Sequence, residues 1–206
     1  MALPSSGAIS LSAIASEFGD STPNSISEFY RGGSLVPNTS VNTNVPTSGQ
    51  ISFNDFYGAA DQLWSTTITN GYYSFGDFAF TTYYRGFKSG TSNNGFWANS
   101  SNIGSGNDTT VDFLSGSNLI VLGEYTIDVE GSSPGGGASV LVFEVQGTHS
   151  NSGFTTLKIG GVSYNRTSAS YTQGGNNARW EWNTGSGANP FGTNSSQQTN
   201  TSVVFV

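Results

Sequence analysis

The chain has 206 residues, a formal net charge of −7, 9% charged and 13% aromatic side chains, and no cysteine. Its six Lys and Arg residues are scattered, so the clustered positive charge of nucleic-acid binders is missing, and without Cys there are no disulfides, thiolate metal sites or thiol nucleophiles. The aromatic content is too high for a disordered chain, while few charges and many turn residues favour an all-β body.

Three similar phrases occupy the first sixty residues: SLSAIA from Ser10, SISEFY from Ser25 and SFNDFY from Ser52. Each begins with Ser, continues with an apolar residue, and returns to apolar side chains three and four positions later, which is the spacing of one helix face. Ser25 with Glu28 fits a capping box, and Ser52 with Asp55 is a shorter-armed version. Glycines suited to helix C′ positions follow the copies: Gly19, Gly32, Gly33 and Gly58.

Helices of about two turns are not stable alone, so these apolar faces need a surface that buries them. Three such faces make a thin core, and we therefore predict a docking module over residues 1–60 that completes its burial on a partner. The polar stretch LVPNTSVNTNVPTSG predicts an extended strap within this module. The alternative is a small lobe packed on the chain's own β domain. The predicted partner-docking residues are Leu11, Ile14, Phe18, Ile26, Phe29, Tyr30, Phe53, Phe56 and Tyr57.

From residue 61 the pattern changes to the alternation of β-strands, which predicts a mainly β fold with an antiparallel β-sandwich or jelly-roll-like domain over residues 61–206. Asn70-Gly71 and Gly160-Gly161 each predict a tight hairpin turn, and NPFG from Asn189 predicts a type I turn. Residues 89–107 are expected to form a long loop. The predicted strands are residues 63–69, 72–80, 118–131, 138–147, 154–159, 162–166, 178–183 and 201–206.

Acidic residues alternate with apolar ones along the predicted strand 118–131, where Glu124, Asp128 and Glu130 share one face. We expect a solvated face. A glycosidase pair of Asp128 and Glu130 is one alternative. A calcium site is another, and no EF-hand spacing supports it. Its candidate ligands are Glu124, Asp128 and Glu130, or Asn107, Asp108 and Asp112.

The single histidine, His149, lies in the polar stretch QGTHSNSG, and no Ser-His-Asp spacing accompanies it. We expect a solvated loop histidine. The sequence therefore predicts no catalytic, cofactor-binding or metal-ligating residue.

The aromatic residues of the β region are expected to fill its core, because alternating rings in strands usually do. Six of these aromatic residues are candidates for rings that stack on sugars: Tyr72, Tyr73, Tyr83, Tyr84, Phe96 and Trp97. Only Trp97 is retained as a predicted glycan contact, because it lies in a polar, Gly-rich stretch.

Two stretches, about half of the chain, carry a resemblance to known proteins. They are SGAISLSAIASEFG…SISEFYRGGSLVP…PTSGQISFNDFYGA, and NSGFTTLKIGGVSYNR followed by ARWEWNTGSGANPFGT. Both resemble virion structural proteins of tailed bacteriophages, especially those of marine and cyanobacterial phages. In that group a similar N-terminal module begins many tail-fibre and minor structural proteins.

The resemblance implies a non-enzymatic virion protein, a short tail or neck appendage docked through its N-terminal module with the sandwich projecting. A capsid decoration protein and a carbohydrate-binding module that recognises host surface glycans are the alternatives, and a polysaccharide hydrolase has the least support. The implied partners are other virion proteins of the tail, neck or capsid, and further copies of the chain, as in a trimer. Neither a cofactor nor nucleic acid is expected. Membrane insertion is not expected either, since no apolar run has the length of a span.

Overall fold

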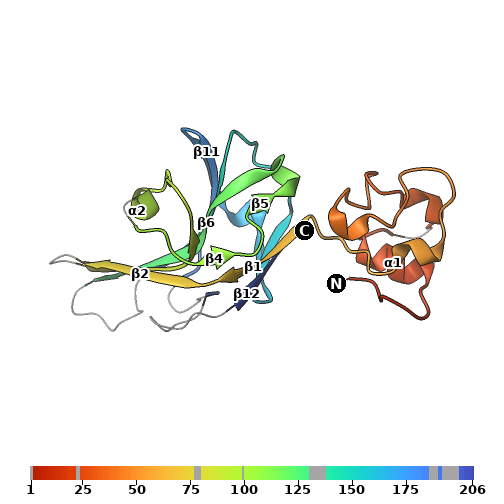
Figure 1. Ribbon diagram of the computed structural model, residues 1–206, viewed down its shortest axis with the longest axis horizontal. Coiled ribbons are helices and arrows are strands. Elements are labelled where there is room, and N and C mark those ends of the chain that lie inside the picture. The colour runs from red at the N-terminus through yellow and green to blue at the C-terminus, as the bar shows by residue number, and fades with distance from the viewer. Residues whose placement is uncertain are drawn as a thin grey trace. The chain divides into compact units, whose positions relative to one another are not determined.

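The chain forms two compact units, Met1–Trp64 and Ser65–Phe205, so the division falls just after the predicted boundary at residue 60 (Figure 1). The computed structural model describes residues 2–21, 24–76, 80–98, 100–129, 138–185, 190–191 and 200–206. Glu130 and half of the predicted turn at residues 189–192 lie outside these ranges.

The three sequence phrases become three short helical elements of the N-terminal unit. They are α1 (Leu11–Glu17) and the 3-10 turns η1 (Ile26–Glu28) and η3 (Phe53–Phe56), with a further turn η2 (Ser40–Asn42) between the second and third. Both predicted capping boxes are confirmed: Glu28 Oε2 accepts the Ser25 amide at 2.7 Å, and Asp55 Oδ2 accepts the Ser52 amide at 2.7 Å.

The apolar faces of these elements pack against one another, so the N-terminal unit has its own core. Phe18, Phe29 and Phe56 form a triangle with ring centroids 6.3–6.4 Å apart. Val36 and Val45 complete the core from the predicted strap and are fully buried, so the prediction of an extended strap is wrong. Asn42, also fully buried, fixes this segment by exchanging two 2.9 Å hydrogen bonds with the backbone of Ala60.

Two tyrosines explain why one phrase occurs twice in the unit. Tyr57 Oη donates to the carbonyl of Gly7 at 2.6 Å, and Tyr30 Oη donates to the carbonyl of Gly49. Each of these glycines is the second residue of the repeated phrase Ser-Gly-x-Ile-Ser, and each has a positive φ, 94° at Gly7 and 86° at Gly49. The repeat therefore supplies equivalent carbonyls to equivalent tyrosines.

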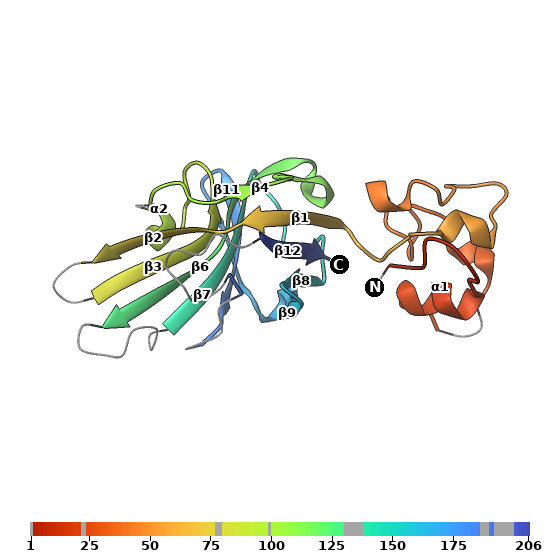
Figure 2. The ribbon, with the colours of Figure 1, turned by 60° about the horizontal axis from the view of Figure 1, so that its bottom comes forward.

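The second unit is a β-sandwich of two antiparallel sheets, which confirms the predicted fold class (Figure 2). The five-stranded sheet has the order β4-β1-β12-β8-β9. The seven-stranded sheet has the order β10-β11-β7-β6-β3-β2, with β5 paired to β6. The strands are β1 (Trp64–Thr69), β2 (Gly71–Gly76), β3 (Phe80–Lys88), β4 (Ser105–Gly106), β5 (Thr110–Val111), β6 (Ser117–Val129), β7 (Ala138–Gln146), β8 (Thr156–Ile159), β9 (Val162–Asn165), β10 (Ser170–Gly174), β11 (Asn177–Asn183) and β12 (Asn200–Phe205).

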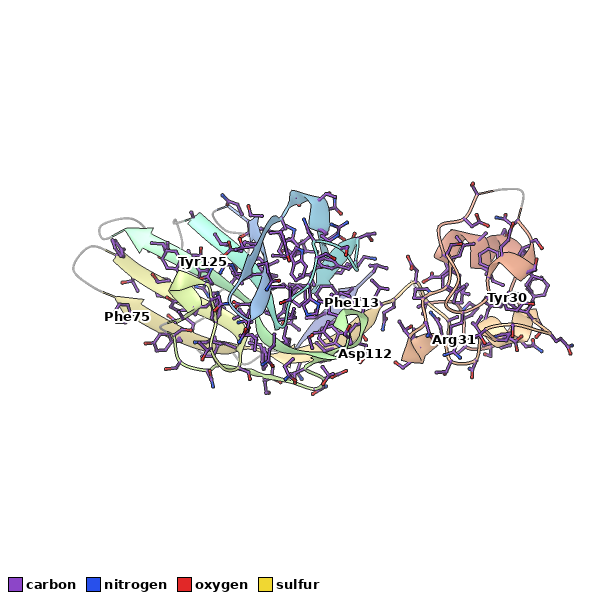
Figure 3. The ribbon with its side chains drawn as sticks, turned by 90° about the horizontal axis from the view of Figure 1, so that it is seen from above. Tyr30, Arg31, Phe75, Asp112, Phe113 and Tyr125 are labelled. Carbon is purple, nitrogen blue, oxygen red and sulfur yellow. The ribbon has the colours of Figure 1, made fainter. Side chains whose placement is uncertain are left out.

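Aromatic rings fill the space between the sheets. Phe143 of β7 lies 4.7 Å from Phe205 of β12 and 5.3 Å from Trp180 of β11, measured between ring centroids. Phe113, from the 3-10 turn η4 (Asp112–Leu114), packs on Phe205 at 5.0 Å (Figure 3). Phe154 closes the cluster at 5.1 Å from Phe205. These contacts are the predicted aromatic core.

The Gly160-Gly161 hairpin is confirmed, but the Asn70-Gly71 hairpin is wrong. Ile159 pairs with Val162 across the first, and both glycines have positive φ. At Asn70-Gly71 the chain passes from one sheet to the other, because β1 pairs with β4 whereas β2 pairs with β3. The predicted strand 72–80 takes in most of β2 and only the first residue of β3, which continues to Lys88 and pairs antiparallel with β2.

Candidate functional site

The outer face of the seven-stranded sheet, opposite the face that meets the second sheet, is covered by residues 89–104, which include the short helix α2 (Gly95–Ala98). This segment was predicted as a plain loop, but a buried carboxylate fixes its start. Glu144 of β7 is fully buried and accepts hydrogen bonds from Ser92 Oγ at 2.5 Å, the Asn93 amide at 2.7 Å and Asn177 Nδ2 at 2.7 Å. Three donors satisfy a buried charge that would otherwise be costly.

A buried lysine fixes the far end of the same segment. Lys88 Nζ donates to the carbonyls of Trp97 at 2.6 Å and Ser100 at 2.5 Å. Burial lowers the pKa of the Lys88 ammonium, and the Glu144 charge opposes this shift. Between the two anchors, Asn94 Oδ1 accepts the amides of Phe96 and Trp97 at 2.9 and 3.0 Å and so begins α2.

Trp97 is completely buried, so the prediction that it contacts a glycan is wrong. Its ring lies 5.1 Å from that of Tyr84 and covers Gly123, where an added Cβ would come within 2.7 Å of the indole. The polar residues around Trp97 suggested that its ring is exposed, but the side chains of these residues form hydrogen bonds with the sheet. The neighbouring Phe96, 39% exposed and stacked on Tyr125 at 4.5 Å, is the ring that reaches the surface.

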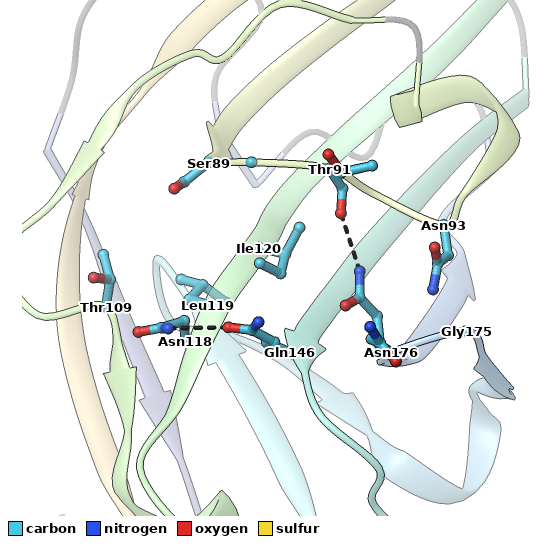
Figure 4. Close-up of a pocket in the computed structure, with 12 residues that line it drawn as sticks. Ser89, Thr91, Asn93, Thr109, Asn118, Leu119, Ile120, Gln146, Gly175 and Asn176 are labelled. Atoms are coloured by element: carbon cyan, nitrogen blue, oxygen red, sulfur yellow. Dashed lines mark hydrogen bonds between the residues drawn. The ribbon is translucent and has the colours of Figure 1, made fainter.

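A groove of about 660 Å³ opens beside the start of this segment (Figure 4). Residues 89–93 form one side, and Gly175 and Asn176, between β10 and β11, form another with Asn177, the first residue of β11. The beginning of β6, the end of β7 and Thr109 complete it. Its size falls in the roughly 300–1,000 Å³ range of small-ligand sites. Sequence reasoning missed this groove because its residues come from five separate segments.

A β-bulge places Ile120 in the groove. Leu119 pairs with Val145 and Val121 with Glu144, so Ile120 is the extra residue on β6. Its half-buried side chain lies between the polar walls (Figure 4). Such bulges commonly re-aim side chains next to functional sites.

The acidic face of β6 is buried, not solvated as predicted. Glu124 is fully buried and Asp128 is 6% exposed. Burial raises the pKa of the Glu124 carboxyl to about 7, against the opposing effects of a 2.7 Å hydrogen bond from Thr184 Oγ1 and the nearby Arg85 charge. The Asp128–Glu130 pair is not testable, since Glu130 lies outside the described residues.

The structure offers no support for the calcium alternative. Within the described ranges, no three His, Asp or Glu side chains gather into a group that could hold a metal ion. Asp108 Oδ1 accepts the Thr110 amide at 2.9 Å, and Asp112 is exposed on η4 (Figure 3).

His149 contacts a serine, but the hydrogen bonds run in the wrong direction for catalysis. Its Nε2 lies 2.9 Å from Ser117 Oγ and 3.1 Å from the Gln146 carbonyl. Ser117 Oγ donates to the Leu114 carbonyl at 2.7 Å, so its proton is not directed at the imidazole. A nucleophilic serine needs the opposite arrangement, with the ring nitrogen accepting that proton.

The predicted docking residues do not share one environment. Ile14, Phe18, Phe29 and Phe56 are buried inside the N-terminal unit, so they cannot meet a partner while the unit is folded. Only Phe53 is exposed, with 41% of its surface accessible. The partly buried members are Leu11, Ile26, Tyr30 and Tyr57.

No protein-family model, curated protein or solved structure matches this chain. Every helix in the described part of the chain is too short or too polar to be a membrane span.

Proposed function

We propose that this chain is a non-enzymatic structural component of a tailed-phage particle, a short tail or neck appendage in which the N-terminal unit docks and the β-sandwich projects. The observation that carries the proposal is the division into a small unit with its own sealed core and a larger sandwich. A unit that folds before it meets a partner suits a plug that is inserted into an assembly. Other virion proteins and further copies of the chain are the proposed partners.

The proposed docking surface is narrower than the one that the sequence predicted. Because four of the nine predicted docking residues are buried and four are half-buried, we assign the contact to Phe53 of η3. Among the described residues of the N-terminal unit it is the only large apolar side chain that is exposed. Exposed aromatic side chains of this kind often carry much of an interface's energy when a partner buries them.

The arrangement of the polar residues favours a non-enzymatic role. The Ser117–His149 contact is directed away from nucleophilic activation, and Glu124 is enclosed in the sandwich. Glu124 is therefore out of reach of a substrate, and the Ser117–His149 pair is not arranged as a nucleophile and its base.

Particle incorporation tests this function. A tagged full-length chain would be expressed during infection, and purified particles would be quantified by mass spectrometry. We expect Phe53→Ser to lower incorporation about tenfold, a typical loss for an aromatic anchor. The matched control is Val162→Ser, which alters a 53% exposed apolar residue on β9 of the sandwich. Equal incorporation of both variants would refute docking through Phe53, and absence of the wild-type chain from particles would refute the virion role.

A further inference from the structure

We propose that the groove between residues 89–93, β6 and the β10–β11 turn is a binding site for a neutral oligosaccharide. No charged side chain lines it within the described part of the chain. The carboxylate of Glu144 is fully buried beneath the wall and accepts hydrogen bonds from three protein donors. A charged ligand would therefore meet no counter-charge among the described lining residues.

The groove presents both hydrogen-bond donors and acceptors that the protein leaves unused. Asn118 Nδ2 donates to Gln146 Oε1 at 3.1 Å, which leaves an acceptor, Asn118 Oδ1, at one end of this pair and a donor, Gln146 Nε2, at the other (Figure 4). A sugar hydroxyl both donates and accepts, so the hydroxyls of one saccharide can bond to either end. The groups without a partner among the described residues also include the side chains of Ser89, Thr91, Thr109 and Asn176.

Ile120 supplies the apolar part of the site. The bulge turns its side chain into the groove, between the amide pair on one side and Thr91 on the other (Figure 4). A sugar ring has an apolar C–H face and a rim of hydroxyls, and pockets that bind organic ligands combine apolar surface with a few placed polar groups. An extended peptide would need several side-chain pockets, and among the described residues that line this groove the large apolar ones are Ile120 and its neighbour Leu119 alone.

The walls are held in place before any ligand arrives. Asn177 is 7% exposed and joins two walls, since its Nδ2 donates to Glu144 and, at 3.1 Å, to the Thr91 carbonyl. Asn93 Nδ2 donates across the groove to the Gly174 carbonyl. A fixed site loses less entropy on binding, which favours affinity from modest contacts.

Affinity electrophoresis of the purified full-length chain tests the site without reference to any particle. The gels would contain dextran, mannan or galactan as neutral polysaccharides, and alginate as an acidic one. We expect retardation by at least one neutral polysaccharide and none by alginate. The double variant Gln146→Ala/Asn176→Ala should weaken that binding about thirtyfold, because two hydrogen bonds of about 1 kcal/mol each are lost.

The matched control is Asn102→Ala, an exposed asparagine outside the groove, and circular dichroism would verify that each variant is folded. Binding that persists in the control and falls in the double variant supports the site. Retardation by no neutral polysaccharide, equal retardation by alginate, or binding unchanged in the double variant would each overturn it. These results are separate from particle incorporation, so either proposal can fail alone.

Discussion

Gly71 lies where the chain passes from one sheet of the sandwich to the other, at the start of β2. An Asn-Gly pair between two alternating runs is a strong hairpin signal. In the structure, Gly71 is required because a Cβ there would lie 2.1 Å from the Gly104 amide nitrogen. Asn70 is buried and donates to the Phe191 carbonyl at 3.0 Å. Neither contact is visible in the sequence, because the partners are far along the chain.

Glu124 should make the stability of the sandwich depend on pH. Its pKa is about 7 in the folded chain against 4.5 ordinarily, so folding disfavours the ionised form. The contribution of Glu124 to the free energy of unfolding is therefore greatest below pH 4.5. It falls by up to about 3 kcal/mol as the pH rises to 7. We expect Glu124→Gln to flatten this part of the profile, as measured by urea denaturation at pH 5 and pH 8.

The nearby Arg85 charge and the Thr184 hydroxyl remain in that variant, so its profile isolates the carboxyl. Asp112→Asn, which alters an exposed acid, is the matched control and should leave the slope unchanged. An unchanged slope in Glu124→Gln would show that other groups cause the pH dependence.

At the scale of elements, strands and helices can be predicted from the sequence where only one face is buried, or where the capping residues are close together in the chain. Both capping boxes and the β8–β9 hairpin follow from neighbouring residues. Which side chains of β6 are buried is harder to predict from the sequence, because the sheet is covered on both faces and Glu124 and Tyr125 are both buried. The alternating pattern then no longer distinguishes core from solvent. The groove could not be predicted from the sequence either, because Ile120 lies in it only as a result of the bulge in the pairing of β6 with β7.

The segment over the outer face should depend on Glu144. Glu144→Ala removes the acceptor that Ser92, the Asn93 amide and Asn177 share, and Asn177 Nδ2 keeps only its bond to the Thr91 carbonyl. We expect a loss of stability of about 2 kcal/mol and faster amide hydrogen exchange from residue 89 to about residue 98. Asp112→Ala, at an exposed site, should change neither. Unaltered exchange in Glu144→Ala would contradict the anchoring role.

At the scale of the whole molecule, the two units have separate cores, so a core substitution should act on its own unit. Phe56→Ala removes one ring of the aromatic triangle and should cost about 3–5 kcal/mol. A unit of about sixty residues has little stability to spare. We expect rapid hydrogen exchange throughout residues 2–64 and unchanged exchange in residues 65–205.

Phe53→Ala is the comparison variant, because it shortens the exposed ring of the same 3-10 turn. It should leave exchange in both units unchanged. Equal destabilisation by Phe53→Ala and Phe56→Ala would mean that the sealed core described here is wrong.

The first and last residues of the packed part of the N-terminal unit lie beside each other. The Leu3 amide donates to the Ala59 carbonyl at 2.8 Å, and the Gly58 amide donates to the Pro4 carbonyl at 3.1 Å. Adjacent ends make such a unit transferable: it can be spliced into a surface loop of an unrelated carrier without stretching the host backbone. A carrier protein that contains the N-terminal unit would show what this unit binds in the absence of the sandwich.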